Sequence, residues 1–461
     1  MKIARHPKAS AFIGFCSLLA VAIVLLTPPS VLASEALTLD QCLVLAAELN
    51  PDIAQAQKAG EEAAFRLQRA RAEFFPELGI TASAGYISEV SRTQIDDMTM
   101  ILSPEMPPVV VPAREIEIGD ENQRDLALTL RQPLFTGGGI KNGVRLAAAA
   151  VTASDNQLAL QKRQIRARVV RAFYELAMAQ NLKSIAQAAD KQIDSHLADA
   201  RNLLAQGMII NSDLYPIEIR KLQTKLKIVQ ADNAIARARV ALAAVMGLSP
   251  DTPVDIIADP DDLPPWPLPA ELAGQPTERE EQKIIRSRID MAEAEEKIAR
   301  AARLPSLGLT AATHYGWPGF KGNDPDWQAW WQAGVALSWN IFDMGRRGHA
   351  QRAARAEVSR LEKEKQAVDS RVALDRINTR LAYEEACRLR IIEAEKVLSA
   401  RANYQTKADN FRVGMASGTD YLDAHTELTT AETDLSMAAA RVHIAWADLL
   451  RAMGIDEGET P

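Results

Sequence analysis

The 461-residue chain is poor in aromatic residues, cysteines and excess positive charge, and each scarcity excludes a class of protein. Aromatic residues make up 5% of the chain, which favours long helices over a conventional packed core. The 53 lysines and arginines are outnumbered by 60 aspartates and glutamates, so no basic surplus exists to bind nucleic-acid phosphates. The three cysteines form no C-x-x-C pair, which argues against a disulfide scaffold and a thiolate zinc site.

Motifs of enzymes and metal sites are also lacking. No G-x-S-x-G, Walker or Rossmann pattern occurs in a suitable context. The histidines at 314, 349 and 425 do not have the spacing of metal ligands. We therefore predict no catalytic residue, no metal, no cofactor and no nucleic-acid partner, and we classify the chain as a non-enzyme.

Residues 1–33 have the pattern of a secretory signal peptide. Three basic residues precede an apolar stretch at 11–26, and small or aliphatic residues precede Ser34. A retained membrane anchor is the alternative, although the stretch is short for a full span. Nothing after it is long and apolar enough for a membrane helix, so any membrane contact has to come through strands or a surface helix.

The mature chain begins with a helical pattern at 39–75, broken near Pro51. The period then changes to two, which predicts a strand at about 77–91. Its apolar face carries Leu78, Ile80, Ala82, Ala84 and Tyr86, and its polar face carries Gly79, Thr81, Ser83 and Gly85. Residues 92–123 contain four prolines and are interpreted as a loop. A second strand is predicted at about 124–135.

Long helices follow. Residues 144–206 contain neither glycine nor proline, which predicts one helix about 95 Å long. Gly207 ends it, and Ser212 or Asp213 can cap a shorter helix that runs to Gly247. The proline-rich segment 248–276 is interpreted as a linker.

The plan then repeats. Strands are predicted at about 305–316 and 328–342, followed by a glycine- and proline-free stretch at 349–413 and a shorter helix. Landmarks in the two halves are separated by a constant 207 residues: Phe135 and Phe342, Gly138 and Gly345, Gly207 and Gly414, Asp213 and Asp420, Gly247 and Gly454. We therefore predict two structural repeats, residues 34–247 and 277–461.

The predicted strands are about ten residues long, with one apolar and one polar face, as in strands that cross a bilayer at a tilt. Five of the seven tryptophans lie in the second hairpin, and aromatic residues at strand ends suit the lipid–water boundary. Four strands cannot close a barrel, and open edges are costly in lipid, so copies of the chain have to pair. A soluble sheet packed on a core and a solvated helical rod are the alternatives.

The two strand-to-helix junctions, Gln132–Gly138 and Trp339–Arg346, resemble those of the TolC-like outer-membrane efflux proteins, and the resemblance extends over the mature chain. It implies an α+β membrane protein: a trimeric 12-stranded β-barrel that continues into a long helical, coiled-coil periplasmic α-barrel. The implied junction residues are Phe135, Gly137, Gly138, Phe342 and Gly345.

The resemblance also implies a periplasmic aperture. Asp420 and Asp423 match the family's D-x-x-D stretch, and their spacing places both carboxylates on one helix face. Asp213 is the equivalent in the first repeat, where Pro216 replaces the second aspartate. Helix capping is the alternative for each aspartate. Phe411 and Ala416 depart from the aromatic and basic residues that lock this tip in the family.

The implied function is that of a passive outer-membrane exit channel in a tripartite efflux or type I secretion system. The implied partners are two further copies of the chain, a periplasmic adaptor protein, an inner-membrane transporter and outer-membrane lipid. The implied location is the outer membrane, with the helices extending into the periplasm. A soluble periplasmic helical scaffold without channel activity is the alternative function.

Overall fold

The computed structural model describes most of the chain after the predicted signal peptide. The residues described are 36–101, 103, 107–258, 262–269, 277–319 and 326–455. The predicted signal peptide, residues 1–33, lies outside this range. No helix within the described range is long and apolar enough to cross a membrane.

The chain forms two compact units, and each draws on both sequence repeats. Unit 1 comprises the described parts of 1–50, 165–267 and 382–447, and unit 2 comprises those of 51–164, 268–381 and 448–461. The boundaries of the compact units therefore differ from those of the repeats, since each repeat contributes segments to both units. The division of the sequence into repeats stays a prediction.

Two helices of equal length dominate the structure. Helix α3 (Gly139–Ala205) and helix α6 (Arg346–Arg412) each have 67 residues, or about 100 Å at 1.5 Å per residue. Both end at a glycine with positive φ, Gly207 and Gly414. The Met208 amide donates to the Leu203 carbonyl oxygen at 2.9 Å, and the Met415 amide donates to Asn410 at 2.8 Å. These are Schellman endings, and the two predicted long helices are confirmed.

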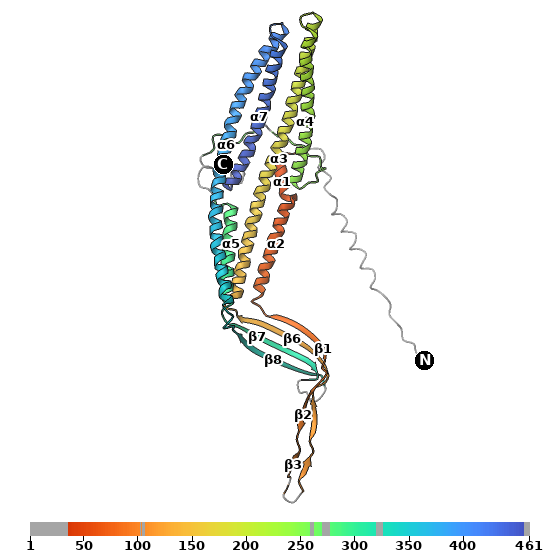
Figure 1. Ribbon diagram of the computed structural model, residues 1–461, viewed down its shortest axis with the longest axis vertical. Helices are drawn as coiled ribbons and strands as arrows, with labels where there is room; N and C mark the ends of the chain where they lie inside the picture. The colour runs from red at the N-terminus through yellow and green to blue at the C-terminus, as the bar shows by residue number, and fades with distance from the viewer. Residues whose placement is uncertain are drawn as a thin grey trace, which may run out of the picture. The chain divides into compact units, whose positions relative to one another are not determined.

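In unit 1, each long helix carries a returning partner, and both pairs can be followed in Figure 1. Helix α4 (Tyr215–Met246) is bound to α3 through ion pairs such as Lys183–Asp232 at 2.7 Å. Helix α7 (Gly418–Met453) is bound to α6 through Lys396–Asp434 at 2.7 Å. The short helix α1 (Leu39–Leu49) begins at a capping box formed by Thr38 and Gln41.

In unit 2, helix α2 (Pro51–Ala72) starts at Pro51, which suits the first helical position because proline lacks an amide hydrogen. The break predicted at this proline is therefore a helix start. Helix α5 (Glu280–Ala301) is the counterpart of α2 in the second half of the chain. Each of these two helices leads directly into a strand.

A four-stranded antiparallel sheet also belongs to unit 2. Its order is β1–β6–β7–β8, from strands β1 (Glu77–Tyr86), β6 (Asn122–Phe135), β7 (Ser306–Trp317) and β8 (Gln328–Ser338). The central β6–β7 pair joins the two sequence repeats, with Leu128 opposite Thr313. Strands β1 and β8 are the outer strands, and each has one edge without a partner among the described residues.

The interpretation of residues 92–123 as a loop was wrong. They form most of a β-ribbon in which β2 (Ser91–Ile95) pairs with β5 (Arg114–Ile118), and β3 (Met98–Met100) pairs with β4 (Val109–Val111). Proline cannot donate to a strand ladder, but Pro107, Pro108 and Pro112 fall between the strands, and Pro104 lies outside the described residues. The β-branched runs between the prolines were therefore free to pair. Strand β1 also ends at Tyr86, earlier than predicted.

Candidate functional site

The first candidate site is the turn between α6 and α7 in unit 1. Ser417 caps α7: its hydroxyl accepts a hydrogen bond from the Asp420 amide at 3.1 Å. In return, the Asp420 carboxylate accepts from the Ser417 amide at 3.2 Å and from the Ser417 hydroxyl at 2.8 Å. This reciprocal arrangement is a capping box. The capping alternative is thus observed for Asp420, whose role in an aperture stays a prediction.

The two carboxylates of the D-x-x-D stretch are both exposed. Hydrogen bonds from the Ser417 side chain and amide, with Lys407 3.6 Å away, hold the pKa of Asp420 below its ordinary value. Asp423 lies one turn further along α7 and makes no ion pair with any described residue. At a spacing of three, the pair presents two acidic groups on one face of the helix.

Asp213 occupies the equivalent turn ahead of α4. Its carboxylate accepts a hydrogen bond from the Ile210 amide at 3.1 Å, within a 3₁₀ turn that spans Asn211–Asp213. Pro216 lies in the first turn of α4. Asp213 therefore also has a local capping role, and no hydrogen bond or ion pair within the described chain joins it to Asp420 or Asp423.

A buried aromatic cluster lies beneath the α6–α7 turn, and the sequence did not point to it. The His196 ring stacks on Tyr421 with centroids 3.6 Å apart, and Phe411 meets His196 edge-on at 4.4 Å. The Tyr421 hydroxyl lies 2.8 Å from the hydroxyl of Tyr404. These residues come from α3, α6 and α7, so the cluster fixes the three helices together at this end of unit 1.

Phe411 and Ala416, the two departures from the family pattern, belong to this packing. Phe411 is buried, and Ala416 packs against the same core. A nearby basic residue, Arg412, forms an exposed ion pair with Asp199 of α3 at 3.7 Å. It also pairs with Asp409 of its own helix at 2.8 Å. Within one chain, the turn is held by apolar packing and this exposed ion pair rather than by a tyrosine hydroxyl at position 411.

Burial affects two histidines here: His196 of the cluster, and His425, whose ring is nearly parallel to that of Tyr421 with centroids 6.3 Å apart. Burial lowers the pKa of His196 to about 4, and the neighbouring His425 contributes in the same direction. Burial likewise lowers the pKa of His425 to about 4. His196 Nε2 has no hydrogen-bond partner. A proton added to either ring would place a charge in an apolar environment.

The second candidate site comprises the two strand-to-helix junctions of unit 2. Gly137 and Gly138 have φ values of 62° and 90°, and Gly345 has 81°, a region that favours glycine. A Cβ at Gly137 would lie 2.8 Å from the Ala301 carbonyl oxygen. Phe135 and Phe342 are exposed beside these turns. The glycines therefore permit the change from strand to helix, and the role of the junctions in a channel stays a prediction.

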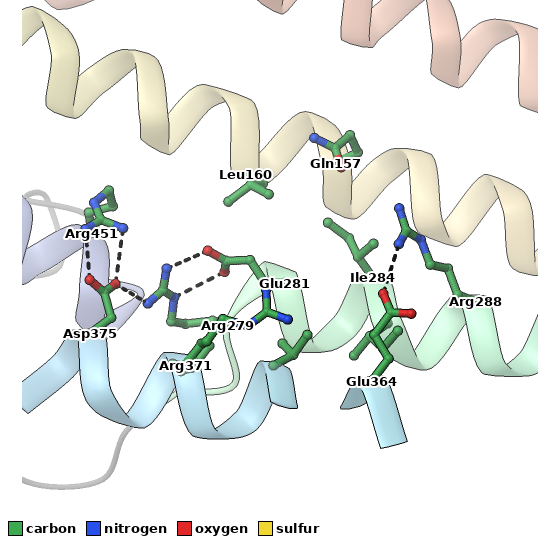
Figure 2. Close-up of a pocket in the computed structure, with 13 residues that line it drawn as sticks. Gln157, Leu160, Arg279, Glu281, Ile284, Arg288, Glu364, Arg371, Asp375 and Arg451 are labelled. Carbon is green, nitrogen blue, oxygen red and sulfur yellow. Dashed lines mark hydrogen bonds and ion pairs between the residues drawn. The ribbon is translucent and has the colours of Figure 1, made fainter. Parts of the chain in front are cut away.

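A cavity of about 440 Å³ lies among α3, α5, α6 and α7 of unit 2. Figure 2 shows its main feature, a chain of ion pairs. The buried Arg279 donates to Glu281 at 3.1 Å and to Asp375 at 2.7 Å, and Arg451 donates to Asp375 at 3.3 Å. Burial alone would raise the pKa of Asp375, but the hydrogen bonds from Arg279 and Arg451 outweigh it and lower the pKa. These charges neutralise one another at the start of α5, and their ion pairs hold α5 and α7 to α6.

Among the described residues, no group of three or more histidine, cysteine, aspartate or glutamate side chains has the arrangement of a metal site.

Comparison with known proteins identifies the chain. The family described as outer membrane efflux protein matches residues 42–248 and 284–455. CyaE of Bordetella pertussis is 28% identical over 262 residues, which is 54% of this chain and 54% of CyaE. The alkaline protease secretion protein AprF of Pseudomonas aeruginosa is 24% identical over 341 residues, which is 72% of this chain and 70% of AprF. The CyaE match thus spans about half the length of that relative.

The fold agrees. The outer membrane protein VceC of Vibrio cholerae has a TM-score of 0.73 at 17% identity, covering 90% of this chain and 96% of VceC. The chain belongs to the outer membrane efflux protein family, as its two junctions predicted. This family and fold are those of channel proteins, and they support the predicted function class, an outer-membrane exit channel.

Gly137→Ala should destabilise the protein. Alanine at a φ of 62° is strained, and its Cβ would crowd the Ala301 carbonyl oxygen and Leu304, so we expect a loss of about 2 kcal/mol in the free energy of unfolding. Gly143→Ala is the matched control, because nothing lies within 4 Å of its added Cβ in α3. The control should be neutral or gain up to about 1 kcal/mol. Equal denaturant midpoints for the two variants would contradict this account.

Acid should weaken unit 1 through its buried histidines. The folded-state pKa values, about 4 for His196 and His425, lie below the unfolded value of about 6.5. The unfolded chain therefore binds more protons between these limits, and stability falls as the pH drops from about 6.5 to about 4, by about 3 kcal/mol per histidine.

Thermal unfolding followed by circular dichroism measures this effect. The double variant His196→Phe, His425→Leu should show a shallower decline of Tm with acid. His349→Gln, which changes an exposed histidine, should decline like the wild type. A double variant with an unchanged pH slope would refute the assignment.

Proposed function

We propose that the protein is the outer-membrane exit channel of a tripartite efflux or type I secretion system, acting as a passive duct for small molecules or polypeptides. The observation that carries the proposal is the four-stranded sheet, whose two edges have no partner among the described residues and which continues into the long helices. A sheet of this kind is incomplete in lipid, because each unpaired backbone group costs several kcal/mol.

The strand directions support closure by identical copies. All three pairings in the sheet are antiparallel, so β8 of one copy runs antiparallel to β1 of the next. Copies can then be added around an axis without breaking the pattern. Two copies would give a barrel that side chains fill, whereas three give a 12-stranded barrel with room for a lumen. We therefore propose a homotrimer.

The faces of the sheet support a position in the outer membrane, with outer-membrane lipid as the surrounding partner. One face exposes apolar side chains along its length, among them Leu78, Ile80, Leu126, Leu128, Val335 and Leu337. Aromatic residues flank this band at both ends. Tyr86, Tyr315, Trp327 and Trp331 lie at one end, and Phe135, Trp339 and Phe342 at the other. Apolar strands between aromatic girdles are typical of outer-membrane barrels.

The helices support a long α-barrel in the periplasm. Helix α4 exposes an apolar stripe spaced alternately by four and three residues: Tyr215, Ile219, Leu222, Leu226 and Val229. This is the seam of a coiled coil, and within one chain it is left in contact with solvent. A neighbouring copy would cover it. The two sequence repeats, 34–247 and 277–461 with the linker 248–276, would each contribute one long helix and one returning helix to such a wall.

Asp420, Asp423 and Asp213 would form acidic rings at the far end of the helices, because three copies bring several carboxylates around one axis. Rings of carboxylates favour cations. A periplasmic adaptor protein and an inner-membrane transporter would supply recognition and energy. The soluble scaffold has no comparable support, because it would leave both the apolar sheet face and the α4 stripe in water.

Planar bilayers test the proposal. The purified full-length protein should extract only with detergent, migrate as an oligomer and produce stepwise, cation-preferring currents. Replacing the exposed carboxylate in Asp423→Asn should lower the preference for K⁺ over Cl⁻ and weaken block by divalent cations.

Glu357→Gln is the matched control, since it removes an exposed carboxylate from α6, where Arg360 keeps its second partner Glu364. It should leave the currents unchanged. Recovery of the protein in the soluble periplasm without detergent, or a monomer without current, would refute the channel. Unchanged selectivity in Asp423→Asn would remove that residue from the aperture.

A further inference from the structure

A polar cluster crosses three strands of the sheet. His314 on β7 lies 3.0 Å from one carboxylate oxygen of Asp125 on β6, through its Nδ1. Its ring stacks on Trp330 of β8 with centroids 5.0 Å apart and 3° between the planes. Its other nitrogen, Nε2, lies 3.3 Å from the side-chain nitrogen of Gln332, also on β8. One histidine is thus held on three sides by groups from the two strands that flank its own.

Gly316 makes room for this arrangement. A Cβ at Gly316 would lie 2.7 Å from the Trp330 ring and 3.2 Å from an Asp125 oxygen. The glycine serves here by its small volume, because its φ is not positive. The His314 side chain keeps 17% of its surface exposed and Asp125 keeps 34%. The cluster is therefore packed, but solvent can reach it.

The cluster lies on the polar face, near the end of the sheet that is remote from the helices. Strand β7 follows α5 directly, so its far end is Trp317, three residues beyond His314. Apart from Glu77, Gln123, Arg131, Pro133 and Gln328, the rest of the polar face is small. It carries Gly79, Thr81, Ser83, Gly85, Ala127, Thr129, Gly308, Thr310, Ala312, Gly334, Ala336 and Ser338. If this face lines a lumen, the cluster is its bulkiest level at that end.

The charge of the cluster depends on one proton. With a neutral imidazole, Nδ1–H donates to Asp125, Nε2 accepts from the Gln332 amide, and the net charge is −1. Protonation of Nε2 brings the net charge of the cluster to zero. Among the described residues of these strands, the other groups at the level of the cluster are uncharged: Gln328 on β8 and Ser83 on β1. Arg131, on the same face of β6, lies six residues from Asp125, or about 20 Å along the strand.

We propose that Asp125, His314, Trp330 and Gln332 form a proton-sensitive charge filter at the outer end of the lumen. Asp125 attracts cations, His314 cancels this attraction when it binds a proton, and Trp330 and Gln332 hold the imidazole beside the carboxylate. This inference rests on the proposed channel, in which three copies would place three such clusters at one level. Rings of charged side chains set the selectivity of pores.

One-sided acidification tests the filter. The full-length channel is held in a planar bilayer under a KCl gradient, and the pH of the chamber on the sheet side is lowered from about 8 to about 5, the range in which histidine commonly changes its charge. The wild-type permeability ratio of K⁺ to Cl⁻ should fall about twofold or more. In His314→Gln, which keeps a hydrogen-bonding group beside Asp125, the ratio should stay high in acid.

Two further variants complete the test. Asp125→Asn should show a low ratio at both pH values. His349→Gln, an exposed histidine outside the cluster, should respond like the wild type. A wild-type ratio that does not change with pH, or an equal fall in His314→Gln, would overturn the filter while leaving the channel intact. A complete absence of current would instead refute the channel itself, and detergent-resistant oligomers in each variant would show that the sheet has assembled.

Discussion

The backbone of the two outer strands constrains everything else in this protein. Strands β1 and β8 each leave a row of amide and carbonyl groups without a partner among the described residues. In water such edges invite aggregation, and in lipid they are prohibitively costly. The apolar outer face of the sheet is likewise unsuited to water. The proposed assembly, in which identical copies pair inside a membrane, would solve both problems.

The long helices are stabilised mainly by close packing against their neighbours. Helices α3 and α6 each span 67 residues without relying on a thick core. Buried alanines such as Ala179, Ala186 and Ala189 let neighbouring helices approach closely. The apolar stripe of α4 remains uncovered within one chain, as the sheet edges do. In the proposed oligomer, sheet and helices would therefore share one property: a neighbouring copy would cover the surface that each leaves exposed.

Much of this architecture could be predicted from the sequence because its signals are local. The long helices followed from stretches without glycine or proline, and the strands followed from a two-residue period at Leu78–Tyr86. The prolines of residues 92–123 predicted a loop, but Pro107, Pro108 and Pro112 lie between the pairing segments and leave the strands intact. The stacking of His196 on Tyr421 and the contact of His314 with Asp125 could not be found, since each joins side chains that are distant in sequence. Their geometry depends on helix packing and strand register.

Cross-linking between the two outer strands tests the central claim most directly. The two cysteines among the described residues, Cys42 and Cys387, are both buried, so introduced cysteines should react without interference. Thr81→Cys on β1 would be combined with a single cysteine at each position from Gln332 to Leu337 on β8, and oxidised in the membrane. We expect covalent dimers and trimers at a few adjacent positions, with the others unreactive. Failure of every combination to link separate copies would contradict closure of the sheet by identical neighbours.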